Sequence, residues 1–298
     1  MSGSNADQAE FWRSGAGDTW VARQAALDWL MQPVLDGVLA RANLMNDQVI
    51  LDIGCGTGAS TLQAAERVGA AGQVHGLDIS PTMLARARDR AQDLDNVKFI
   101  EADAADFNFE PALFDQMISR FGTMFFADAV GAFSNMRKAM RPGAGMSCAS
   151  WGAIANNPWF TYSAAAAKAV LGAPPAVDPD APGPFSMRDP ERVRDVLEQA
   201  GFEDIGVAVS ALDLTPQGNR RDVAELAVNV GPAGRTILHF NGTDADQDAI
   251  SARIFDSYAL RPLKHQMGCV FRPRSFSFRP RPLIPELVLT LAGQINIC

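Results

Sequence analysis

Residues 49–61, VILDIGCGTGAST, place an acid within an apolar run and then three glycines within five positions. The run VILDI is typical of a buried strand, and Gly54, Gly56 and Gly58 let the main chain turn without a Cβ in a ligand's path. A glycine loop between a parallel strand and a helix brings backbone N–H groups and the positive end of a helix close to a ligand. The stretch therefore predicts a nucleotide-like site.

Short apolar runs alternate with amphipathic stretches over the following hundred residues. This alternation predicts an α/β fold with a doubly wound, mostly parallel sheet. The expected strands are 49–55, 73–79, 97–103, 114–122, 144–152 and 204–214, and the expected helices are 59–69, 81–94, 129–143 and 188–202. A seventh strand belongs near 268–280, where alternating arginine and proline fit a strand poorly because proline cannot donate to a sheet.

Changes in this rhythm divide the chain into five segments. We expect an N-terminal helical lid at 1–45, a core that binds the cofactor at 46–152, and a proline-rich lid or substrate insertion at 153–188. Residues 189–267 then continue the same domain, and 268–298 form an atypical tail.

The bulk composition restricts the partners. The formal net charge of −8 and the pI near 4.9 disfavour nucleic acids and anionic membranes. Four scattered cysteines predict neither a disulfide framework nor a metal site, and they fit a reducing compartment. The first residues do not resemble a signal peptide, and no apolar run is long enough to span a bilayer. We therefore expect a cytoplasmic protein whose partner is a small molecule, with the oligomeric state left open.

The glycines alone do not choose a cofactor, because GCGTGA also satisfies the dinucleotide fingerprint G-x-G-x-x-G/A. Asp52 lies two residues before the first glycine, where a pyrophosphate has no evident use for a carboxylate but an ammonium group has. Asp78 ends the second expected strand, where a carboxylate accepts from ribose hydroxyls. Asp103 ends the third, within reach of an exocyclic adenine amine. Each acid also has a structural interpretation, as a satisfied strand residue, a helix cap or a strand end.

With these acids, the sequence resembles the class I S-adenosylmethionine-dependent methyltransferases, in particular the small-molecule group of the ubiquinone/menaquinone C-methyltransferases. The resemblance covers about 45–215 and implies a seven-stranded Rossmann-like sheet. The segments that carry it are ILDIGCGTG (50–58), GLDIS (76–80), EADAADFNF (101–109), FDQMISRFGTMFF (114–126) and MRPGAGM (140–146).

The resemblance implies S-adenosyl-L-methionine as the cofactor and a role for each matching residue. Asp52 would orient the glycine loop and the methionine amino group, Asp78 would hold the ribose, and Asp103 with Ala104 would meet the adenine. Arg120 departs from the family, which often has a small residue or asparagine near this strand end, and its guanidinium would pair with the cofactor carboxylate. The remaining cofactor contacts would be Gly54, Cys55, Gly56 and Gly58 beside the methionine and ribose, and Ile79 and Met83 beside the adenine.

The acceptor is less constrained than the donor. Trp12, Trp20, Trp151 and Trp159 are candidates for lining its pocket, or they simply cover the core, and no residue stands out as a catalytic base. We expect transfer to a carbon or oxygen of a small, partly hydrophobic molecule. Two other interpretations stay open, an NAD-dependent oxidoreductase and a cofactor-binding protein without transfer activity.

Overall fold

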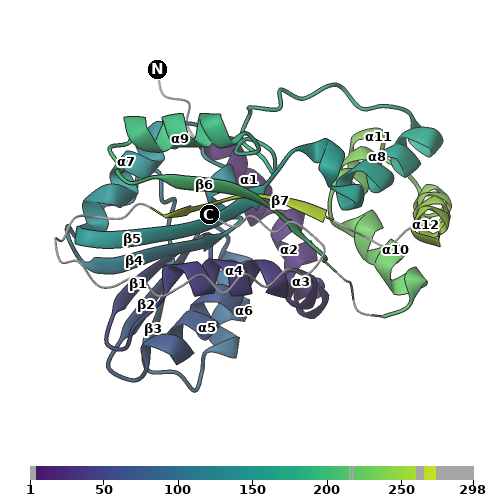
Figure 1. Ribbon diagram of the computed structural model, residues 1–298. Coiled ribbons are helices and arrows are strands. Elements are labelled where there is room, and N and C mark those ends of the chain that lie inside the picture. The colour runs from purple at the N-terminus through teal and green to yellow at the C-terminus, as the bar shows by residue number, and fades with distance from the viewer. Residues whose placement is uncertain (1–4, 215, 217, 260–264, 273–298) are drawn as a thin grey trace, which may run out of the picture.

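A computed structural model describes residues 5–214, 216, 218–259 and 265–272 (Figure 1). The strands of these ranges pair in the order β3-β2-β1-β4-β5-β7-β6. The run from β3 to β5 is parallel, whereas β7 is antiparallel to both β5 and β6. The strand bounds are β1 Val49–Ile53, β2 Gln73–Asp78, β3 Val97–Glu101, β4 Phe114–Arg120, β5 Met140–Trp151, β6 Gly206–Leu212 and β7 His265–Arg272.

The predicted α/β fold with a mostly parallel, doubly wound sheet is confirmed for the five parallel strands. Strand β1 lies at their centre, and Ile50, Leu51, Asp52 and Ile53 are all buried in it. The carboxyl ends of parallel strands meet at one edge, which is where ligands bind in such sheets. The fold therefore places the glycine loop and the ends of β2, β3 and β4 together.

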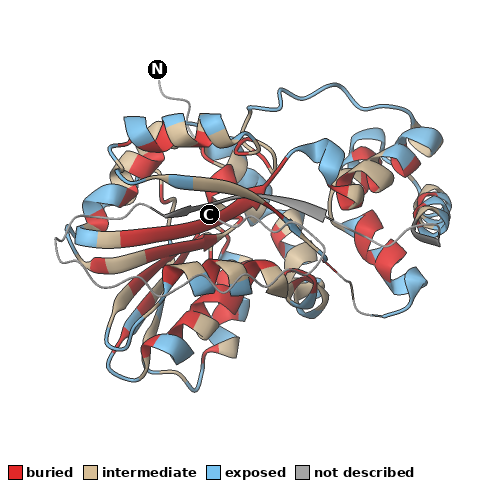
Figure 2. Cartoon of the chain, in the orientation of Figure 1, coloured by how far each residue is buried: buried red, intermediate tan, exposed pale blue. Residues whose placement is uncertain are grey.

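Helices cover both faces of this sheet and keep it buried (Figures 1 and 2). Local signals start several of them: Ser80 caps the helix that begins at Pro81, and Asp128 caps the next by accepting from the Gly131 N–H. On one face lie α4 Gln32–Ala42, α5 Ala59–Val68 and α6 Pro81–Arg90, and on the other lie α7 Ala129–Ala139 and α9 Pro190–Gln199.

A second group of helices, which we call the helical cap, packs beyond the carboxyl edge of the sheet (Figure 1). Its members are α8 Pro158–Leu171, α10 Arg220–Asn229, α11 Pro232–Phe240 and α12 Asp244–Ala259. The sequence groups α10 to α12 with the C-terminal part of the sheet domain at 189–267, but in the structure they pack on α8 of the 153–188 insertion. Of that segment, α9, β6 and the start of β7 belong to the sheet layers.

The N-terminal helices do not behave as one unit. Three short ones lie near the cavity, namely α1 Ala6–Arg13, α2 Gly15–Ala22 and α3 Gln24–Leu30. Helix α4, in contrast, packs on β4 and β5, and the Val38 carbonyl accepts a hydrogen bond from Ser147 Oγ at 2.9 Å. The lid at 1–45 stays a prediction, and residues 1–4 lie outside the described residues.

Two predicted boundaries move for local reasons. The helix expected over 129–143 ends at Ala139, because Met140 is extended and already pairs with Phe114. Strand β5 therefore begins before Pro142, at an irregularity in its register with β4. The poorly fitting stretch contributes β7 up to Arg272, and the rest of the tail, 273–298, lies outside the described residues. Two short 3-10 turns, η1 Gly122–Met124 and η2 Ile154–Asn156, complete the elements.

No helix within the described ranges combines the length and the apolar character needed to cross a membrane.

The loops that follow β1 and β4 cross at backbone contact. A Cβ on Gly122 would lie 2.3 Å from the Ile53 carbonyl oxygen and 2.7 Å from Gly54 Cα. Ser119 braces the same crossing, since its Oγ donates to the Ile53 carbonyl at 2.7 Å and accepts from the Gly122 N–H at 3.1 Å. This crossing fixes how the glycine loop leaves the sheet.

We predict that Gly122→Ala lowers the free energy of unfolding by about 1–3 kcal/mol, because the new methyl group forces the two loops apart. Gly206→Ala is the matched control, because nothing lies within 4 Å of a Cβ there. Urea denaturation of both variants measures the difference, and equal stabilities would show that the loops separate without cost.

Candidate functional site

The three glycines of the loop all adopt positive φ angles, +64° at Gly54, +56° at Gly56 and +89° at Gly58. Residues with a side chain rarely adopt this backbone conformation, so the shape of the loop requires glycine at these three positions. The N–H groups of Gly54 and Cys55 both donate to the Leu77 carbonyl, at 2.8 and 3.1 Å, which draws the loop toward the end of β2. The loop is thus held in one shape by the neighbouring strand.

Asp78 holds the same loop through its side chain. Its Oδ2 accepts from the Gly56 N–H at 2.7 Å, and its Oδ1 accepts from the Ser80 N–H at 2.9 Å. Burial raises the pKa of this carboxyl, while the backbone donors at Ser80 and Gly56 oppose the shift. Asp78 therefore joins the glycine loop to the first turn of α6 and still lines the cavity described below.

Asp52 lies deeper than the sequence suggests. Its side chain is fully buried, and Oδ2 accepts from the hydroxyls of Ser60 and Thr61, both at 2.6 Å, in the first turn of α5. Its Oδ1 has no hydrogen-bond partner among the described residues. Burial raises the pKa of Asp52 to about 6, although the two hydroxyls and the charge of Arg120 oppose the shift. Asp52 thus positions the helix that follows the loop.

Asp103 connects the site to the N-terminal helices. Its Oδ1 accepts from the Ala105 N–H at 2.9 Å, while its Oδ2 accepts from the Asn5 side-chain amide at 2.8 Å. The side-chain Oδ1 of Asn5 in turn accepts from the Ala127 N–H at 3.2 Å. The start of α1 is thereby fastened across the ends of β3 and β4.

Arg120, at the end of β4, carries a buried guanidinium with one free nitrogen. Its Nη2 lies 3.4 Å from Asp28 Oδ1, and the other oxygen of Asp28 pairs with Arg90 at 2.9 Å. Arg120 Nη1 has no hydrogen-bond partner among the described residues. Burial lowers the pKa of Arg120 and Asp28 opposes the shift. A buried donor without a partner is unfavourable, so this nitrogen is suited to an anionic ligand group.

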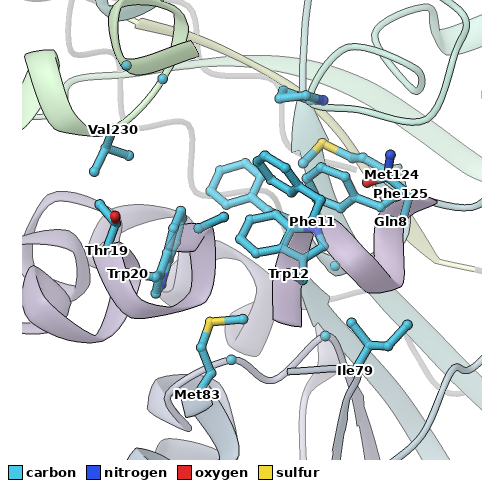
Figure 3. A pocket seen from close by; sticks show the side chains of 18 of the residues that line it. Gln8, Phe11, Trp12, Thr19, Trp20, Ile79, Met83, Met124, Phe125 and Val230 are labelled. Carbon is cyan, nitrogen blue, oxygen red and sulfur yellow. The ribbon is translucent and has the colours of Figure 1, made fainter. Parts of the chain in front are cut away.

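These elements enclose one cavity of about 830 Å³, a volume typical of ligand-binding pockets (Figure 3). All predicted site residues line it except Asp52 and Gly58. Asp52 is buried behind the loop, and a Cβ on Gly58 would face Ala87 at 3.1 Å, so this glycine serves the packing of α5 on α6. Those that line the cavity are Trp12, Trp20, Gly54, Cys55, Gly56, Asp78, Ile79, Met83, Asp103, Ala104, Arg120, Trp151 and Trp159.

Figure 3 shows the side chains of Ile79 and Met83 on the sheet side of the cavity, below the aromatic residues of α1 and α2. Cys55 lines the same side as a buried free thiol. Burial raises the pKa of this thiol far above its usual range, so it stays neutral. No feature of Cys55 indicates a nucleophile.

Aromatic rings from α1 and α2 and from the ends of β4 and β5 form much of the remaining lining. Trp12 packs edge-on against Trp20 and Phe125, with ring centroids 5.9 and 5.2 Å apart. Trp151 stacks on Phe121 at 4.5 Å, and Phe121 adopts a positive φ of 71°, which turns the chain sharply after β4. The wall suits a flat, largely apolar molecule.

Several lining residues carry no signal in the sequence. Asn5 and Phe11 precede the first motif, and Phe121 lies within the segment 114–126 but is not singled out there as a site residue. Arg235 lies about 180 residues from the glycine loop, and only the packing of the helical cap brings it to the cavity. Only the tertiary contacts identify these positions.

Comparison with known proteins locates a recognised unit within the chain. Residues 50–143 match the family described as "Methyltransferase domain". An aklanonic acid methyltransferase of Streptomyces sp. (strain C5) is 42% identical over 87 residues, 28% of this chain and 40% of that protein. A demethylmenaquinone methyltransferase of Staphylococcus epidermidis is 32% identical over 111 residues, 37% of this chain and 46% of that protein. The chain thus spans less than half the length of these relatives.

Solved structures share the fold over a larger part of the chain. A phosphoethanolamine N-methyltransferase 2 of Haemonchus contortus, solved with S-adenosyl-L-methionine, aligns over 92% of this chain and 60% of its own, with a TM-score of 0.57 and 20% identity. The [4+2]-cyclase SpnF aligns over 82% of both chains, with a TM-score of 0.52 and 17% identity. At these identities the likeness shows the fold and no more.

The raised pKa of Asp52 predicts a pH-dependent stability. In the folded chain this carboxyl holds its proton up to about pH 6, whereas its ordinary pKa is 3.8. The contribution of Asp52 to the free energy of unfolding is therefore largest at low pH. It falls by about 3 kcal/mol at most as the pH rises from about 4 through 6. Asp52→Asn removes the titrating group and with it this loss.

Urea denaturation at pH 4 and pH 7 tests this expectation. The stability of the Asn variant relative to the unaltered protein should improve between the two pH values. Asp36→Asn, at an exposed position on α4, is the control. The same pH dependence in the unaltered protein and in Asp52→Asn would contradict the assignment.

Proposed function

We propose that this chain, whose residues 50–143 match a methyltransferase domain, binds S-adenosyl-L-methionine and transfers its methyl group to a carbon or oxygen of a small, partly hydrophobic acceptor. The observation that carries the proposal is the gathering of the glycine loop, Asp78, Asp103 and Arg120 around one cavity. Aromatic residues on the other side leave an apolar surface for a second molecule.

The lining residues fit this cofactor. Arg120 Nη1 is a buried donor without a partner and would bind the cofactor carboxylate. A Cβ on Gly56 would meet nothing nearer than Met83 Sδ at 3.8 Å, so the loop leaves open space above it. Asp78 and Asp103 would accept from the ribose and the adenine amine, while Ile79, Met83 and Ala104 would contact the adenine. Asp52 would act through the loop and α5, which it positions.

When bound, S-adenosyl-L-methionine supplies a methyl group on a sulfonium, already activated for displacement by a nucleophile. The protein then has to align the acceptor and keep water away. Trp12, Trp20, Trp151 and Trp159 would do both from the aromatic wall. The described lining residues include no histidine, and both lining carboxylates already accept backbone or amide hydrogen bonds. We therefore propose alignment without a dedicated base.

The fold suggests how the parts divide this work. We propose that 46–152 binds the cofactor and that α1 to α3, together with the 153–188 insertion, cover the acceptor. The helices of 220–259 would act with that insertion as one cap. We also infer that β7 completes a seven-stranded sheet.

Two other functions are weaker. An NAD-dependent oxidoreductase is not favoured, because the matched family is a methyltransferase domain. A cofactor-binding protein without methyl transfer has one observation in its favour, since a protein named as a [4+2]-cyclase shares this fold. Measuring turnover separates this possibility from a methyltransferase.

We predict that Arg120→Met weakens binding of S-adenosylhomocysteine about tenfold or more, because the cofactor carboxylate loses a charged donor. Arg120→Lys keeps the charge and should lose less. Isothermal titration measures both, and Arg86→Met on α6 is the control, since Arg86 is exposed and donates hydrogen bonds to Gln24. Unchanged affinity in Arg120→Met would remove Arg120 from the site.

The function itself is tested by incubating the full chain with S-adenosyl-L-methionine and a panel of aromatic phenols, carboxylic acids and quinones. Mass spectrometry should detect a methylated product together with S-adenosylhomocysteine. Binding of S-adenosylhomocysteine without turnover on any acceptor would favour the binding protein. Binding of NADH without binding of S-adenosylhomocysteine would overturn the proposal.

A further inference from the structure

A second arginine enters the cavity from the helical cap. Arg235 lies on α11, and it lines the cavity together with Val230 and Ile237 of the same cap. The other charged residues that line the described cavity are Asp78, Asp103 and Arg120, and all three come from strand ends of the sheet. Arg235 is therefore a cation on the side of the cavity that the cofactor residues do not occupy.

Arg235 differs from those three residues in having no polar partner. Asp78 accepts a hydrogen bond from the Gly56 N–H, and Asp103 accepts one from the Asn5 side chain. Arg120 pairs with Asp28. Within the described part of the chain, the Arg235 side chain has no ion pair or hydrogen bond. Its contact is with Phe11, whose ring centroid lies 5.9 Å from the guanidinium carbon. The five N–H donors of this group remain available to a ligand.

The position of Arg235 at the cavity distinguishes it from an arginine on the open surface. Arg235 is an exposed residue, but it lines the cavity, and the protein atoms around its guanidinium lower the pKa of this group through burial. A planar guanidinium that packs on an aromatic ring and has free donors matches the geometry of an anionic oxygen group.

We propose that Arg235 recognises an anionic oxygen group, a carboxylate or an ionised hydroxyl, on an aromatic methyl acceptor. This inference rests on the proposed function and narrows its acceptor class. The ring of such an acceptor lies against the aromatic wall formed by Phe11, Trp12 and Trp20 (Figure 3), and its charged group reaches α11. Arg235 is thus a specificity residue at the acceptor end of the cavity.

The test compares two molecules of nearly the same shape that differ in charge. Isothermal titration of 2-naphthoate and of 2-naphthamide into the full chain saturated with S-adenosylhomocysteine should show at least about tenfold tighter binding of the carboxylate. A second pair, 2-hydroxy-1,4-naphthoquinone and its methyl ether, asks whether an ionised hydroxyl is preferred in the same way. Tighter binding of the anion in either pair supports the proposal, and the two pairs tell the two groups apart.

Variants assign the preference to the residue. Arg235→Gln should reduce the preference for the anion to about none, and Arg235→Lys should retain part of it. Arg253→Gln makes the same change of charge on α12, at an exposed position away from the cavity lining, and should leave the preference unchanged. Affinity for S-adenosylhomocysteine, measured in every variant, shows that the fold and the cofactor site are intact.

Absence of any preference for either anion in the unaltered protein, including absence of binding, would overturn the inference. A preference that survives in Arg235→Gln would do so as well. If the unaltered protein does not bind S-adenosylhomocysteine, the proposed cofactor is wrong, and the same titrations without it still report on Arg235.

Discussion

The hydrogen bond between the Gly56 N–H and the Asp78 carboxylate determines the form of the site. A carboxylate with 6% of its surface exposed is costly unless donors surround it, and here both donors are backbone N–H groups, from Gly56 and Ser80. The acid therefore fixes two loops at once, and the glycine loop leaves the sheet in one direction. The cavity floor depends on that direction.

The cover of the cavity is held differently from its floor. Asn5 bonds to Asp103, and Arg23 pairs with Glu225 of the helical cap at 2.9 Å across exposed side chains. Exposed ion pairs contribute little to stability, so the Arg23–Glu225 pair separates at low cost. The proposed adenine contact at Asp103 Oδ2 would replace the Asn5 amide by another N–H donor. Such an exchange conserves a hydrogen bond, which suits a cover that admits ligands.

The sequence predicts what depends on local pattern. Strands β1 and β2 lie where the apolar runs place them, and the glycine loop adopts the turn that its composition requires. The motif does not predict which way Asp52 and Gly58 face. The Asp52 side chain bonds to the first turn of α5, and a Cβ on Gly58 would face α6, so neither residue lines the cavity. The helical cap was not foreseen as one unit, since its contacts join α8 to helices at least 48 residues later. The sequence does not predict that Arg235 lines the cavity either, because no local pattern distinguishes it from other exposed arginines.

The two sides of the cavity are therefore determined by different constraints. On the sheet side, positive φ angles and buried carboxylates restrict each position to few residue types. Because of these restrictions, the proposed cofactor site can be predicted from the sequence. On the side formed by α1, α2 and the helical cap, the rings of Phe11, Trp12 and Trp20 need only to fill space, so many apolar residues satisfy the same packing. A charged residue on that side is the exception, because nothing in the packing of α11 requires a guanidinium at position 235. Under our proposal its free N–H donors beside the cavity restrict the charge of the acceptor, whereas the aromatic wall restricts only its shape and apolar character.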